Sequence, residues 1–165
     1  MNQVPDDTAL ADLAMALASR MKAGGRMLAT AESCTGGWIA KVCTDLPGSS
    51  AWFESGLVTY SNRAKFELLG VSLSNLNQFG AVSEIVAAEM ARGARNAAHA
   101  DWAVSVTGIA GPDGGTPDKP VGTVCFGWVG PGDEPETEAC LFSGDRDQVR
   151  RQTVAYALSG LLGRL

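Results

Sequence analysis

The chain has 165 residues, of which 45% are hydrophobic and 19% are charged, and its formal net charge is -5 at pH 7. This length and composition are typical of one compact domain with its own core, and they exclude a disordered chain. We therefore expect a single domain over residues 1–165. The acidic balance argues against a broad nucleic-acid-binding surface, because nucleic acid attracts basic faces.

Four cysteines are spread along the chain without a C-x-x-C pair, and there is one histidine. This pattern disfavours a structural zinc site and fits reduced cysteines in a cytosolic protein. No stretch approaches the roughly 20 apolar residues that a membrane span needs. We expect a cytoplasmic protein that holds no metal ion and does not enter a membrane.

Hydrophobic residues recur at helical spacing over residues 7–22, and a nearly continuous apolar run follows over residues 26–32. These patterns predict a helix and then a strand that is covered on both faces. A serine and two glycines break the strand at residues 33–37, and a second helical pattern runs over residues 35–45. The sequence therefore predicts a strand, a turn and a helix in direct succession.

The turn that begins at Ser33 has two interpretations. Serine and threonine before a helix most often cap it, which would give Ser33 or Thr35 a structural role. Alternatively Ser33 is a nucleophile, because the first N–H groups of a helix carry a partial positive charge and can hold an oxyanion or a phosphate. Cys34 is a second potential nucleophile, but we expect it to pack inward.

The rest of the chain alternates between strand and helix patterns. In order, we predict a strand over 52–60, a short helix over 61–70, a loop over 73–80, a helix over 83–99, a strand over 101–107, a glycine-rich turn over 108–115, two strands over 123–129 and 136–142, and a helix over 146–162. The two late strands predict an antiparallel hairpin. The order as a whole predicts an α/β fold, a three-layer α/β/α sandwich around a mixed, mainly parallel sheet with a C-terminal antiparallel hairpin.

Three predicted strands end in polar residues or glycine, at Ser33, at Tyr60 and at Thr107 with Gly108. Ligands of open α/β sheets bind outside the carboxyl ends of the strands, so we expect these residues to share one site. Arg146 and Arg150 are four residues apart near the start of the last helix and share a face of it. They would either hold an anion or be solvated.

A Ser-His-Asp triad is disfavoured, because His99 ends a helix that leads into the start of a strand, at the opposite edge of the sheet from Ser33. The proton of a nucleophilic Ser33 would then pass to a lysine that burial keeps neutral, or through a tyrosine hydroxyl. Lys65 and Tyr60 are the nearest candidates for these two roles. The ordinary alternatives are a solvated surface lysine and a half-buried strand aromatic.

The sequence resembles the CinA C-terminal domain family, known as nicotinamide mononucleotide deamidases or nicotinamide-nucleotide amidohydrolases. Six stretches match in family order and cover nearly the whole chain beyond the first helix. They are residues 31–37, 58–62 with Lys65, 80–83, 106–112 with 114–115, 119–122 and 142–146. Longer members carry an additional amino-terminal molybdopterin-binding-like domain, so the resemblance is to the stand-alone form.

The resemblance implies that the protein hydrolyses the carboxamide of nicotinamide mononucleotide to nicotinate mononucleotide and ammonia in pyridine nucleotide recycling, without a cofactor. It implies that Ser33 forms an acyl-enzyme, and that Tyr60 and Lys65 activate Ser33 and carry the proton to ammonia. The residues that it implies at the substrate, its oxyanion or its phosphate are Thr35, Gly36, Thr107, Gly108 and Arg146.

Two other hypotheses compete with the amidohydrolase. In a non-catalytic nucleotide-binding module, the glycine turns would bind a phosphate and Ser33 would only cap a helix. A nucleic-acid partner is the other, and the acidic balance of the chain disfavours it. The partner that we expect is a small-molecule pyridine nucleotide, and the family likeness is consistent with a homodimer.

Overall fold

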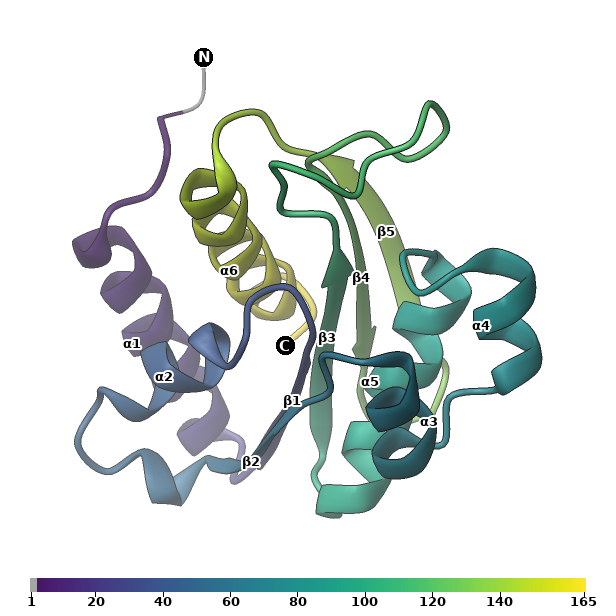
Figure 1. Ribbon diagram of the computed structural model, residues 1–165. Coiled ribbons are helices and arrows are strands. Elements are labelled where there is room, and N and C mark those ends of the chain that lie inside the picture. Colours follow the sequence, from purple (N-terminus) through teal and green to yellow (C-terminus); the bar gives the residue numbers. More distant parts are fainter. Residues whose placement is uncertain (1–2) are drawn as a thin grey trace.

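The computed structural model describes residues 3–165, which form a five-stranded sheet between two layers of helices (Figure 1). The strands are β1 (Leu28–Glu32), β2 (Phe53–Val58), β3 (Trp102–Gly108), β4 (Thr123–Val129) and β5 (Glu136–Leu141). One face of the sheet carries α1 (Asp7–Ala23), α2 (Trp38–Thr44) and α6 (Arg146–Leu162). The other carries α3 (Asn62–Leu69), α4 (Leu73–Phe79) and α5 (Glu84–Ala98). A short 3-10 turn, η1 (Ser49–Ala51), precedes β2.

The strands follow the order β2-β1-β3-β4-β5. β1 pairs in parallel with β2 and with β3, whereas β4 pairs antiparallel with β3 and with β5. These pairings confirm the predicted α/β class and the C-terminal hairpin. Glu32 of β1 lies opposite Val58 of β2 and Val106 of β3, so β1 and β2 end level with one another and β3 continues for two more residues, to Gly108. Segments that follow these strands therefore meet at one edge of the sheet.

Strand β1 is buried on both faces. Leu28 packs into the core beneath α1, α2 and α6, while Ala29 and Ala31 pack into the core beneath α3, α4 and α5. A strand covered on both sides reads as an almost unbroken apolar run, which is why the sequence marked it clearly. No helix within residues 3–165 is long and apolar enough to cross a membrane.

Helix α2 begins at Trp38, three residues after the start that the sequence predicted. The reason is local, because Gly36 and Gly37 have φ angles of 61° and 99°. This left-handed region does not continue into a right-handed helix, and glycine reaches it without steric cost. The turn at residues 33–37 is therefore longer and more sharply bent than we expected.

Residues 73–80 form helix α4 up to Phe79, so the prediction of a loop there was wrong. Ser72 caps this helix by accepting a hydrogen bond from the Asn75 amide nitrogen at 3.3 Å. The Asn75 side chain donates in turn to Glu89 of α5 at 2.7 Å. Asparagine and serine have weak helix propensity, and contacts with α5 override that preference here.

Helix α3 lies close against α5 at Gly93. A Cβ atom placed on Gly93 would lie 2.0 Å from the carbonyl oxygen of Leu69, which is closer than any real contact. Glycine therefore sets the distance between these two helices. This distance affects the site, because α3 carries Lys65.

Candidate active site

Ser33 and Lys65 meet at the edge of the sheet where β1 ends. The Lys65 amine lies 2.9 Å from the Ser33 hydroxyl oxygen. It also donates to the carbonyl oxygens of Thr59 at 2.8 Å and Tyr60 at 3.3 Å. The structure thus brings the predicted hydroxyl and amine into direct contact.

Lys65 is only 1% exposed, although lysine is almost never fully buried without a counter-charge. Its contacts are a hydroxyl and two carbonyl groups, which carry no full negative charge. Burial therefore disfavours the charged form, and it lowers the pKa of Lys65 from 10.5 to about 8. The surface-lysine alternative is wrong.

Backbone hydrogen bonds fix both sides of this contact to the sheet. The Ser33 amide nitrogen donates to the Val106 carbonyl oxygen of β3 at 3.1 Å. The Thr59 amide nitrogen donates to the Glu32 carbonyl oxygen of β1 at 2.9 Å. The hydroxyl and the carbonyl that holds the lysine are therefore both anchored to adjacent strand ends.

Glu32 is the residue that caps α2, and neither Ser33 nor Thr35 does so. Its fully buried carboxylate accepts hydrogen bonds from the amide nitrogens of Ile39 at 2.8 Å and Ala40 at 3.0 Å. It also accepts a hydrogen bond from the Thr35 hydroxyl at 2.7 Å. A carboxylate at the start of a helix satisfies amides that lack partners and complements the helix dipole. Because α2 has its cap, the Ser33 hydroxyl is left for Lys65.

Cys34 is buried, as we expected, whereas Thr35 and Gly36 line a different cavity from Ser33. Burial raises the pKa of the Cys34 thiol to about 12, so it stays protonated near neutral pH and is a poor nucleophile. The Gly36 amide nitrogen donates to the Ser33 carbonyl oxygen at 3.0 Å, which occupies it within the turn. Thr35 and Gly36 line a separate cavity on the far side of the turn.

Tyr60 and Arg146 lie together at the same cavity as Ser33. Tyr60 is 60% exposed, and its hydroxyl accepts a hydrogen bond from Arg146 at 3.0 Å. Arg146 also donates to the carbonyl oxygen of Gly111 at 2.7 Å. The backbone carbonyl of Tyr60 contacts Lys65, whereas the phenol of Tyr60 contacts Arg146.

Thr107 and Gly108 complete the cavity, which has a volume of about 280 Å³. Thr107 is buried, and its hydroxyl donates to the carbonyl oxygen of Ala81 at 2.9 Å. Asn62 and Asp113 also line the cavity, and neither was among the predicted site residues. Distant segments therefore converge on one hollow as expected, and Thr35 and Gly36 line the cavity on the other side of the turn.

Arg146 and Arg150 do not converge on one anion. Arg146 lines the cavity of Ser33, whereas Arg150 donates to the carbonyl oxygens of Cys34 and Thr35, each at 3.0 Å. The shared helical face brings the two guanidinium groups to opposite sides of the turn. Within residues 3–165, no three His, Cys, Asp or Glu side chains gather to hold a metal ion.

Sequence reasoning missed the cap formed by Glu32, and it expected Arg150 to hold an anion or be solvated and not to bind the turn. A signal for Glu32 existed, because an acid at the end of an apolar strand must find hydrogen-bond donors once it is buried. Arg150 carried no comparable signal, because its targets lie far away in the sequence and are main-chain atoms.

A serine hydroxyl in contact with a buried lysine amine, at the carboxyl end of a strand, resembles the serine–lysine pairs of hydrolase active sites. The family model described as the CinA C-terminal domain matches residues 10–165. The chain belongs to this family.

Similar proteins agree with this assignment over most of their length. The nicotinamide-nucleotide amidohydrolase PncC of Escherichia coli K12 is 57% identical over 155 residues, which is 94% of each chain. The protein of the same name from Pseudomonas putida is 53% identical over 91% of this chain and 93% of its own. The crystal structure of the competence/damage inducible protein CihA from Agrobacterium tumefaciens superposes with a TM-score of 0.92 at 41% identity, over 99% of this chain and 98% of that chain.

The substitution Glu32→Gln should lower the free energy of unfolding by about 1–3 kcal/mol. The glutamine NH₂ group would replace an oxygen that accepts hydrogen bonds, so a buried N–H or O–H group of the turn would lose its acceptor. Urea denaturation measures this loss. Glu54→Gln, at an exposed glutamate of β2, is the matched control and should leave the midpoint unchanged. Equal midpoints for both variants would show that the Glu32 carboxylate does not hold the turn.

Proposed function

We propose that this protein hydrolyses the carboxamide of nicotinamide mononucleotide to nicotinate mononucleotide and ammonia. The observation that carries the proposal is the 2.9 Å contact between the Lys65 amine and the Ser33 hydroxyl, inside a cavity that also holds Arg146. The names of the relatives from Escherichia coli and Pseudomonas putida support the choice of substrate.

Lys65 is suited to act as a general base in its neutral form. A neutral amine has two hydrogens and one lone pair, and two of its three neighbours are carbonyl oxygens that can only accept. The two N–H groups therefore donate to Thr59 and Tyr60, and the lone pair faces the hydroxyl of Ser33. With a pKa of about 8, about a tenth of the lysine is neutral at pH 7, far more than for an exposed lysine.

In the first half of the reaction, the Ser33 oxygen attacks the carboxamide carbon while Lys65 takes the hydroxyl proton. The tetrahedral oxyanion then collapses and the C–N bond breaks. Lys65 gives its proton to the leaving nitrogen, which departs as ammonia, and the nicotinoyl group remains as an ester on Ser33.

In the second half, a water molecule attacks the ester and passes its proton to Lys65. The bond between the Ser33 oxygen and the acyl carbon breaks, and Lys65 returns the proton to that oxygen. Nicotinate mononucleotide leaves, and both residues regain their starting protonation states. The cycle consumes one water molecule and needs no metal ion or organic cofactor.

Arg146 is placed to bind the phosphate of the substrate. Two of its N–H groups hold Gly111 and Tyr60, and the guanidinium retains further donors toward the cavity. Charge-assisted hydrogen bonds from arginine suit a phosphate, which often binds two of them. Tyr60 orients this arginine through its hydroxyl and lies within the same cavity as the nucleophile.

A homodimer and a cytoplasmic location remain predictions.

Ser33→Ala should reduce ammonia release from nicotinamide mononucleotide by at least about 10³-fold, because it removes the attacking oxygen. A colorimetric ammonia assay measures this rate. Cys34→Ser is the control, and it should keep substantial activity because the thiol does not react. Equal rates for wild type and Ser33→Ala would reject the nucleophile. Binding without ammonia from either would favour the nucleotide-binding module.

The kcat/KM of the wild type should rise with pH and level off above about 8, because neutral Lys65 is the active form. Rates measured between about pH 6 and about pH 10 define the inflection. Lys65→Arg should be inactive across this range, because a guanidinium does not lose its proton. A flat profile for the wild type would contradict the role of Lys65 as base.

Arg146→Met should raise the KM for nicotinamide mononucleotide by about 10-fold or more, because a charge-assisted hydrogen bond contributes about 1.5–3 kcal/mol. Nicotinamide riboside lacks the phosphate, so its kcat/KM should change little. Steady-state kinetics with both substrates test this difference. An equal loss for both would show that Arg146 acts through Tyr60 or Gly111 and not on the phosphate.

A further inference from the structure

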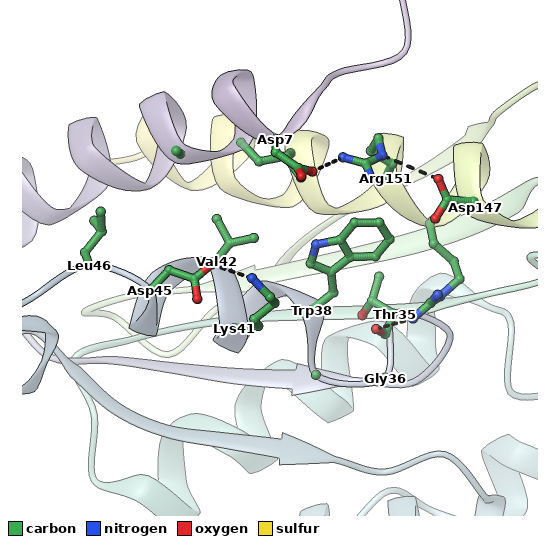
Figure 2. A pocket seen from close by; sticks show the side chains of 14 residues that line it. Asp7, Thr35, Gly36, Trp38, Lys41, Val42, Asp45, Leu46, Asp147 and Arg151 are labelled. Carbon is green, nitrogen blue, oxygen red and sulfur yellow. Dashed lines mark hydrogen bonds and ion pairs between the residues drawn. The ribbon is translucent and has the colours of Figure 1, made fainter.

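A second, larger cavity of about 670 Å³ lies between α1, α2 and α6, behind the turn formed by residues 33–37 (Figure 2). Its charged groups are largely paired within the protein. Figure 2 shows Arg151 joined to Asp7 and Asp147 above the ring of Trp38, and one further pair, Lys41 with Asp45, lines the same cavity. With its charges balanced in this way, the cavity does not select a charged ligand. The cavity matters because Arg150, which lines it, binds the turn of residues 33–37 from the side away from Ser33.

Arg150 holds two successive carbonyl groups of the turn in one guanidinium fork. Its Nε atom donates to the Cys34 oxygen at 3.0 Å, and its Nη2 atom donates to the Thr35 oxygen at 3.0 Å. The guanidinium carbon also lies 5.2 Å from the centre of the Trp38 ring, within the range of a cation–π contact. Arginine offers this rigid double donor, and lysine does not.

These two hydrogen bonds orient the carbonyl groups of Cys34 and Thr35, and they thereby orient the N–H group of Thr35 as well. A trans peptide is planar, and its N–H points opposite to its C=O. The Cys34 carbonyl faces Arg150, so the N–H of Thr35 points away from the guanidinium. Ser33 and Cys34 line the small cavity, whereas Thr35 and Gly36 line the large one, so the turn is the wall between them. The N–H of Thr35 is thereby directed to the Ser33 side of this wall.

We propose that Arg150 is a positioning residue, which holds the nucleophile turn from behind and directs the Thr35 amide toward the oxyanion that forms beside Ser33. This inference rests on the proposed function, because the oxyanion belongs to the acylation step. Arg150 does not touch the substrate. Its positive charge further strengthens the amide, since hydrogen bonds in a chain polarise one another.

Arg150→Met should lower kcat by about 10²-fold or more while the KM changes by less than about twofold, as expected for a lost oxyanion donor. The pH inflection near 8 should stay in place, because Lys65 keeps all of its contacts. Arg151→Met is the matched control. Arg151 lies on the same helix and in the same cavity, 4.9 Å from the Trp38 ring, but it pairs with Asp7 and Asp147. Its kcat should be that of the wild type.

Chemical rescue separates positioning from a general loss of structure. In Arg150→Ala, the missing group leaves a space that adjoins the large cavity, which a small guanidinium ion can enter. Ethylguanidinium chloride at millimolar concentration should restore at least about a tenth of the lost kcat, and sodium chloride at the same ionic strength should not. An equal fall of kcat in the Arg150 and Arg151 variants without rescue would overturn the proposal.

The labelling of Ser33 by a fluorophosphonate tests the inference without the amide substrate. The phosphoryl oxygen of this probe needs the same donor, so intact-mass measurements should show slower labelling of Arg150→Met than of wild type and Arg151→Met. A wild type that releases no ammonia but shows this order of labelling would reject the proposed substrate and support the positioning role. Equal labelling of all three would overturn the positioning role.

Discussion

The burial of the Lys65 amine is the constraint on which the rest of the site depends. A lysine enclosed by a hydroxyl and two carbonyls loses its hydration and gains no counter-charge, so its proton is held weakly. A fall in pKa from 10.5 to about 8 corresponds to about 3 kcal/mol against the charged form. Since the unfolded chain keeps this proton up to higher pH, the contribution of Lys65 to stability improves as the pH rises from about 8 toward 10.5.

The surrounding fold holds the hydrogen-bond partners of Lys65 in place, although the burial of this lysine is itself unfavourable. Glu32 shows how, because one buried carboxylate joins the end of β1 to the first turn of α2 and to the Thr35 hydroxyl. The turn that carries Ser33 is thus tied to strand, helix and the neighbouring strand β3 at once. Ser33, the proposed nucleophile, lies on this turn, whereas the phenol of Tyr60 is exposed and contacts Arg146 in the same cavity.

The sequence predicted the local structure and the meeting of Ser33, Lys65 and Thr107 at one edge of the sheet, but it missed several individual long-range contacts. The strand before Ser33 and the glycines after it were evident, because a doubly covered strand and left-handed turns each leave a compositional mark. The burial of Lys65 left none, because it arises only when α3 packs on the rest of the molecule. Helix α4 was missed for the same reason, and the carbonyl targets of Arg150 are main-chain atoms that no side-chain motif reveals.

The close approach of α3 to α5 at Gly93 gives a residue without a side chain an influence on the position of Lys65, the proposed base. A methyl group at this position would clash with the Leu69 carbonyl and push α3 away from α5. Because α3 carries Lys65, this movement would displace the Lys65 amine from Ser33. A shift of a few tenths of an ångström there is comparable to the difference between a firm and a weak hydrogen bond. The position of the Lys65 amine relative to Ser33 therefore depends on the contact between α3 and α5, on the face of the sheet opposite α2.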